Sequence, residues 1–250
     1  MYEILSRVWG SGAQNFRDGW VAVLEAEWGS GEFARRHAEV GALLSETIRQ
    51  IHALPEAQRV RYSRYFPQWW TAVMQPDLSW SDRGRPASVL VGQETLDHLA
   101  SAADLLETAM RGTSAAPSGS NLEELAESCR SWLEILADTS DSELPAALKN
   151  EIAAQITHLL WLIEHAELFG VARVSRETNQ VLGSLTQAST MLAGVDAQAG
   201  GRWKRAFLGL VTASVVFTAG ATQVQTAIEA GTGVVKEITQ VVDGITNSAE

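Results

Sequence analysis

The hydrophobic residues of this chain recur at intervals of three and four positions, which is the spacing of one face of an α-helix. Segments with the alternating polar and apolar pattern of a β-strand are missing from the sequence. One face of a helix over residues 32–54 would collect Phe33, Val40, Leu44, Ile48, Ile51 and Leu54. The pattern therefore predicts an all-α protein.

Prolines divide the first part of the chain into further helices. Pro55 cannot continue the helix before it, but it can open a helix over residues 56–65. Pro67 requires a break before a short aromatic helix with the sequence QWWTAVM, which Pro76 ends. The turn-forming sequence PDLSWSDRGRPAS follows, and a last helix of this part is expected over residues 93–110.

The small, polar sequence GTSAAPSGS at residues 112–120 is expected to be a linker. Beyond it, two capping-box signatures predict helix starts, one formed by Ser120 with Glu123 and one by Ser140 with Glu143. The second of these helices is expected to run to residue 169, where the following glycine would end it. Another helix should cover residues 175–192.

Together these signals predict a bundle of roughly eight helices that ends in a long C-terminal helix. The expected organisation has four parts. They are an N-terminal helical domain at residues 1–111, the linker at 112–120, an acidic helical segment at 121–200, and a hydrophobic, self-associating helix at 201–250.

The C-terminal helix has an apolar seam of the kind that packs lengthwise against another helix. Alternating steps of four and three residues from Ala206 meet only apolar or small residues as far as Ile245, which is the spacing of helices that associate side by side. Small residues at such a seam let two backbones approach closely. The predicted self-association and membrane contacts are Trp203, Ala206, Leu210, Ala213, Phe217, Gly220, Val224 and Ala227.

Two interpretations of this helix stay open. Residues 206–228 carry no charge, and Arg202, Lys204 and Arg205 precede them, as expected for a membrane span whose N-terminal side stays in the cytosol. Trp203 would then lie at the membrane interface. The competing interpretation is a central helix of a soluble bundle or coiled coil, because the charge-free stretch also contains two glutamines and several threonines.

Composition narrows the choice of partners. The formal net charge of −11 makes general nucleic-acid binding unfavourable, because nucleic acids are polyanions. The acid is concentrated in residues 112–200, which carry 12 Asp and Glu against 4 Arg and Lys. A single cysteine, Cys129, allows no internal disulfide and fits a reducing compartment.

The sequence lacks the usual motifs of catalysis. It has no nucleophile elbow, phosphate-binding P-loop, dinucleotide fingerprint, zinc-protease helix or paired CxxC. Cys129 lies on an apolar helical stripe, so we interpret it as a buried structural thiol. His158 and His165 lack the partners that a metal site needs. The chain is therefore expected to be no enzyme, with no cofactor and no metal ion.

Arginines and aromatic residues interleave in the sequence RVRYSRYFPQWW. Arginine over aromatic rings can hold anions or nucleobases, so this region is a candidate anion or ligand patch. In the competing interpretation, the aromatic residues fill a core and the arginines pair with acidic residues. The residues of this arginine–tryptophan patch are Arg59, Arg61, Arg64, Trp69 and Trp70.

Three functional hypotheses follow. The first is a non-enzymatic effector or sensor that oligomerises and acts at the membrane through its C-terminal helix, as a growth-arrest or abortive-infection-like defence protein would. Its cytoplasmic body would be attached to the inner face of the cell membrane, and its partners would be its own copies, the membrane and a further protein. The alternative is a soluble all-α interaction or scaffold module with a C-terminal oligomerisation helix. The third is a small-molecule or nucleotide binder that uses the arginine–tryptophan patch.

Overall fold

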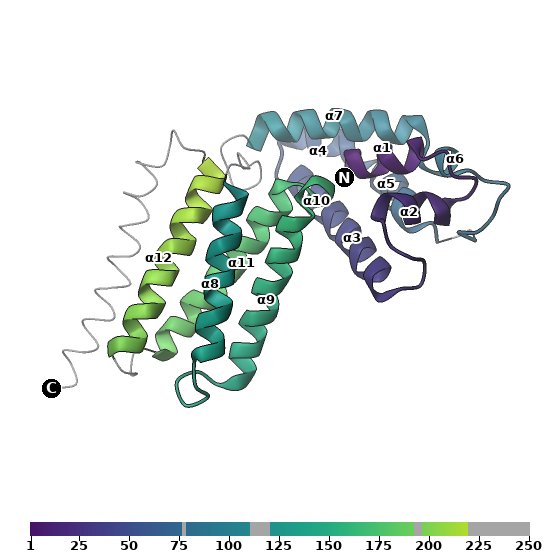
Figure 1. Cartoon of the computed structure of the whole chain (residues 1–250). Coiled ribbons are helices and arrows are strands. Elements are labelled where there is room, and N and C mark those ends of the chain that lie inside the picture. The colour runs from purple at the N-terminus through teal and green to yellow at the C-terminus, as the bar shows by residue number, and fades with distance from the viewer. Residues whose placement is uncertain (77–78, 111–120, 193–196, 220–250) are drawn as a thin grey trace. The chain divides into compact units, whose positions relative to one another are not determined.

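The computed structural model describes residues 1–76, 79–110, 121–192 and 197–219. These residues form twelve α-helices and no strand (Figure 1), so the prediction of an all-α protein is confirmed. The chain divides into two compact units, Met1–Met110 and Arg111–Glu250. The number of helices exceeds the expected one mainly because several short helices escaped the periodicity analysis.

The first unit is built from helices α1 to α7, coloured purple to teal in Figure 1. The long helix α3 contacts α2, α4, α5 and α7, and α7 in turn contacts α1 and α6, so these two helices connect the parts of the unit. The bounds of the helices are α1 (Tyr2–Gly10), α2 (Phe16–Leu24), α3 (Gly31–His52), α4 (Glu56–Ser63), α5 (Phe66–Met74), α6 (Ala87–Val91) and α7 (Gln93–Met110).

The long helices of this unit lie where the sequence predicts them. Helix α7 has the expected bounds, and α3 begins after Ser30, whose hydroxyl accepts a hydrogen bond of 3.0 Å from the backbone N–H of Phe33. Pro55 precedes α4 as expected. Helices α1, α2 and α6 were not predicted. Because they have nine, nine and five residues, they repeat the helical period too few times to be recognised.

Helices α2 and α6 approach each other closely at Gly19. A Cβ atom at this position would lie 2.8 Å from the Cβ atom of Ala87, which is itself buried. Two carbon atoms cannot pack at that distance, since their contact optimum lies near 3.5–4.0 Å. The glycine is therefore a requirement of the packing rather than of the local backbone.

We expect Gly19→Ala to lower the stability of the first unit by about 1–3 kcal/mol, because the extra methyl group forces α2 and α6 apart. Gly10→Ala is the matched control. It lies in α1, and its Cβ atom would meet nothing within 4 Å. Thermal unfolding followed by circular dichroism measures both variants. Equal melting temperatures for the two would contradict this account of the α2–α6 contact.

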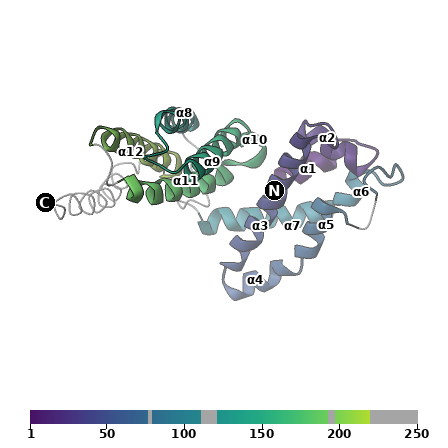
Figure 2. The ribbon, with the colours of Figure 1, turned by 90° about the horizontal axis from the view of Figure 1, so that it is seen from below.

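The second unit contains a four-helix bundle, shown in Figures 1 and 2. Each long helix packs along two neighbours, in the cyclic order α8, α9, α11 and α12. Successive helices run in opposite directions, so α12 lies antiparallel to α8. The bounds are α8 (Leu122–Asp138), α9 (Ala146–Glu164), the single turn α10 (Ala166–Phe169), α11 (Val171–Leu192) and α12 (Ala197–Ala219).

The helix expected over residues 140–169 begins later and is interrupted. Glu143 accepts hydrogen bonds from the backbone N–H (2.8 Å) and the hydroxyl (2.9 Å) of Ser140, and these bonds lower the pKa of the Glu143 carboxyl. The predicted contact therefore forms, but it closes a turn, and α9 starts only after Pro145. His165 separates α9 from α10, and Gly170, with φ +83°, ends α10 as expected.

The start of α8 also differs from the prediction. Asn121 is the residue that precedes the helix, in a left-handed conformation with φ 61°, and its side-chain amide donates to Glu124 at 3.3 Å. Ser120, the expected cap, lies outside the described residues, as does the whole predicted linker at 112–120.

The core of the bundle is apolar and includes two tryptophans. Trp132 of α8 is fully buried, and its ring lies edge-on to the ring of Trp203 of α12, with centroids 4.9 Å apart. Such aromatic pairs add about 0.5–1.5 kcal/mol to the stabilisation that burial provides. The other fully buried large residues of this unit include Leu125, Leu136, Ile152, Ile156, Leu159, Leu162, Leu210 and Phe217.

Candidate functional site

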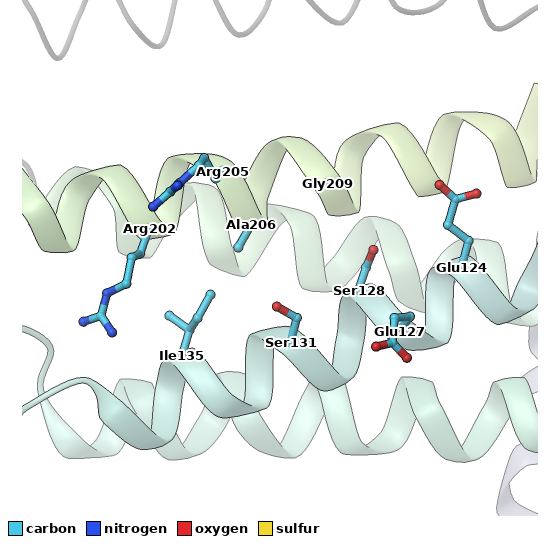
Figure 3. Close-up of a pocket in the computed structure, with 9 residues that line it drawn as sticks. All are labelled: Glu124, Glu127, Ser128, Ser131, Ile135, Arg202, Arg205, Ala206 and Gly209. Carbon is cyan, nitrogen blue, oxygen red and sulfur yellow. The ribbon is translucent and has the colours of Figure 1, made fainter.

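The described part of the second unit has an open groove between α8 and α12, with a volume of ≈ 510 Å³ (Figure 3). Most of the residues that line it are either small or charged. Five of its lining residues come from α8 and four from α12. They are Glu124, Glu127, Ser128, Ser131, Ile135, Arg202, Arg205, Ala206 and Gly209.

The groove arises from side-chain size at the outer edge of the α8–α12 contact. On α8, the stripe that faces the bundle interior is buried and includes Cys129 and Trp132, while Ser128 and Ser131 lie beside it. On α12, Gly209 lies next to the buried Leu210. Because serine and glycine side chains do not fill the space between two neighbouring helices, a hollow remains along the surface.

The charges of the groove are sorted by sign along its length. Arg202 and Arg205 project from the N-terminal part of α12 at one end, and Glu124 lies on α8 at the other end, with the two serines between them (Figure 3). Arg202 lies 3.8 Å from the carboxylate of Asp138, and Glu127 lies 3.2 Å from Arg130. These pairs are exposed, so they contribute little to stability and leave the side chains able to change partners.

The predicted self-association seam lies mostly inside the bundle. Trp203, Leu210, Ala213 and Phe217 are buried in the unit that α12 forms with α8 and α11, and Ala206 is half-buried at the groove. Gly220, Val224 and Ala227 lie outside the described residues. The first half of the seam therefore has partners within the same chain.

The described residues also bear on the membrane interpretation. Among the helices in this part of the chain, none has both the length and the sustained apolar character that crossing a bilayer requires. In α12, exposed positions follow Trp203 and include Lys204 and Arg205.

The arginine–tryptophan patch of the first unit is divided between surface and core. Trp69 is fully buried, and its indole N–H has no hydrogen-bond partner among the described residues. Trp70, by contrast, is 45% exposed. Arg61 and Arg64 are exposed and Arg59 is half-buried. The patch thus places one of its two tryptophans where a ligand has no access.

Other aromatic residues of this unit pack around His37. Its ring centroid lies 5.1 Å from that of Trp20 and 5.2 Å from that of Trp80, and its Nε2 lies 3.1 Å from the carbonyl oxygen of Val73. Burial lowers the pKa of His37, so the ring is neutral near pH 7. The packing of these rings, together with that of Trp69, supports the interpretation that the aromatic residues build a core.

The cysteine and the two histidines of the second unit are buried or half-buried in the bundle. Cys129 is fully buried, and burial raises the pKa of its thiol to about 12. Its thiolate form is therefore scarce at neutral pH, and the thiol is a poor nucleophile. In the same bundle, Arg173 donates to the buried Glu177 at 2.8 Å and lies 3.4 Å from the Nε2 atom of His158.

His165 is also engaged, because its Nδ1 atom lies 2.7 Å from the carbonyl oxygen of Trp161. The polar contacts of His158 and His165 are thus with different groups, and the rings of both pack against the ring of Trp161. Within the described ranges, no group of three or more His, Cys, Asp or Glu side chains is arranged to hold a metal ion.

Sequence reasoning found part of the groove only. Ala206 was predicted as a contact residue, whereas Ser128, Ser131 and Gly209 were not singled out. The available signal was the small residues that flank the apolar stripes of two helices. That signal does not reveal which two helices lie side by side.

Comparison with known proteins gives no relative for this chain: no family model, no curated protein and no solved structure matches it.

We expect Trp69→Ala to destabilise the first unit by about 3–5 kcal/mol, because it removes a fully buried indole. Trp70→Ala is the matched control on the next residue of the same helix, and it should cost less than about 1 kcal/mol, since this ring is already partly in water. Urea unfolding followed by circular dichroism measures both. If Trp69→Ala unfolds at the wild-type midpoint, the buried assignment is wrong.

Proposed function

We propose that the protein is a non-enzymatic all-α interaction protein whose C-terminal unit self-associates. One observation carries this proposal. Helix α12 buries one face in its own bundle, and beside that face it borders an open groove lined by small and oppositely charged side chains. Small side chains allow another helix to approach closely, and charges at both ends of a groove select the partner and its orientation.

The chemistry of the groove supports binding rather than catalysis. Its hydroxyl groups belong to Ser128 and Ser131, and none of its described lining residues is a histidine, lysine or cysteine. A serine needs an adjacent base to become a nucleophile, and a histidine is the usual one. Cys129, the single cysteine, lies beneath the groove in the bundle interior and has a raised pKa. The side chains of this groove can therefore bind a partner through hydrogen bonds and ion pairs.

The burial of α12 supports an action that leaves the bundle intact. Fully burying a leucine or phenylalanine side chain contributes about 1.5–3 kcal/mol. Leu210 and Phe217 are both fully buried, and Trp203 packs against Trp132. Extracting α12 would forfeit these contributions together and expose the apolar face of α8. A protein that associates through the outer surface of the bundle incurs none of this cost.

We expect the full-length protein to form an oligomer, so that light scattering coupled to size exclusion gives a whole multiple of the 27.1 kDa of the single chain. The mass should fall toward the single-chain value on dilution and at high salt, because charged groups contribute to the interface. A mass of one chain throughout a wide range of protein concentration would contradict self-association.

A second candidate function is action at a membrane, as the sequence analysis suggests. The observation that favours it is the arrangement of α12, in which the exposed Arg202, Lys204 and Arg205 are followed by a charge-free helical stretch. The sequence stays uncharged to residue 228. Such cations bind anionic headgroups. A trigger would have to release α12 from α8 and α11, after which oligomerisation at the inner face of the membrane would produce a growth-arrest or defence response.

Flotation of the full-length protein with lipid vesicles separates the two candidates. The interaction proposal predicts that the protein stays at the bottom of the gradient, both with phosphatidylcholine vesicles and with vesicles that also contain phosphatidylglycerol. Binding by the cations alone would be lost at high salt. Flotation with either vesicle type that persists at high salt requires apolar insertion, and it would favour the membrane candidate over the first proposal.

A further inference from the structure

The charges of the α8–α12 groove complement those of a second, identical groove that runs in the opposite direction. Arg202 and Arg205 form its basic end, and Glu124 and Glu127 its acidic end (Figure 3). The basic end lies at the level of Asp138, which pairs with Arg202 at 3.8 Å. Glu127 and Asp138 are separated by eleven residues of one helix, or about 16 Å. The two ends are therefore far enough apart to be contacted separately.

Consider a twofold axis that lies in the interface and is perpendicular to the length of the groove. It would place the basic end of each copy against the acidic end of the other copy. In such an isologous contact the same patch serves both subunits, so every residue pair occurs twice. Arg202 and Arg205 of one copy would face Glu124 and Glu127 of the other, and the reverse contact would form at the far end. A parallel arrangement would instead place like charges together, which costs several kcal/mol.

The middle of the groove is lined by small residues, so a second pair of helices can approach it closely. Ser128, Ser131 and Ala206 carry small side chains, and a Cβ atom added at Gly209 would meet no atom within 4 Å. Helices approach most closely where the residues between them are small. The uncharged centre therefore permits close contact, while the charged ends determine direction.

We propose that a second copy of this chain docks antiparallel on the α8–α12 groove, giving a twofold-symmetric dimer held by four arginines and four glutamates. This inference rests on the proposed function, because it identifies the surface through which the C-terminal unit self-associates. It commits to a second copy rather than to a small ligand or another protein, because the charges of the groove complement the groove itself.

The first test fills the groove without disturbing the bundle. Gly209→Leu places a large side chain where the chain itself has open space, so the fold is retained and the partner is excluded. Gly183→Leu is the matched control. This glycine lies on α11 of the same bundle, it is exposed, and its added Cβ atom also meets nothing within 4 Å. Sedimentation equilibrium should show a dissociation constant about tenfold higher or more for Gly209→Leu, and an unchanged constant for Gly183→Leu.

The second test uses charge reversal and mixing. A chain with Arg202→Glu and Arg205→Glu has only acidic ends, and a chain with Glu124→Arg and Glu127→Arg has only basic ends. Each should sediment as a 27.1 kDa monomer, because like charges meet at both ends. Mixed in equal amounts, the two should form a heterodimer of twice that mass. Arg83→Glu with Arg85→Glu is the control, since both arginines are exposed in the first unit and the change in charge is the same.

The outcomes separate this inference from the proposed function. If the wild-type chain is an oligomer and neither Gly209→Leu nor the charge reversals change its mass, the groove is not the interface, and only the inference is overturned. Failure of the two reversed chains to associate on mixing overturns it as well. If the wild-type chain is a monomer at every concentration, both this inference and the proposed self-association are overturned. Circular dichroism of every variant confirms that the helices are intact.

Discussion

The packing of α12 against α8 is the contact on which the rest of the second unit depends. Trp203 and Trp132 meet edge to face across it, and Leu210 and Phe217 are fully buried. Each such side chain contributes about 1.5–3 kcal/mol when buried, and a domain is stable by only about 5–15 kcal/mol in total. The bundle therefore depends on α12, and any function of this helix has to be compatible with its place in the core.

The sequence predicted the helices that repeat their period often enough. Helix α7 has the expected bounds, and α3 differs from its prediction by a residue or two, because both present a long apolar stripe and clear ends. The short helices α1, α2 and α6 escaped because two turns of a helix also resemble a turn-rich loop. At Ser140 and Glu143 the capping contact was predicted correctly and its consequence was not, since Pro145 determines where α9 begins.

The candidate site was harder to predict from the sequence than the helices were. The seam of α12 was recognised, but periodicity shows only that a helix needs a partner, and not whether the partner lies in the same chain. The answer depends on long-range packing against α8 and α11. The same limit applies to Trp69 and Trp70, which are neighbours of the same type, one fully buried and one 45% exposed. Likewise, Ser128 and Gly209 line a groove only because α8 and α12, which are far apart in the sequence, pack side by side.

We propose that α12 acts in place, as a bundle helix with an exposed groove on its flank. Hydrogen–deuterium exchange of the full-length protein, with and without phosphatidylglycerol vesicles, tests it most directly, because amide protection reports local opening. We predict that residues 203–217 are protected as strongly as the buried stretch of α8, and that vesicles leave this protection unchanged. Fast exchange of residues 203–217 in solution, or loss of their contact with α8 on addition of vesicles, would contradict the account.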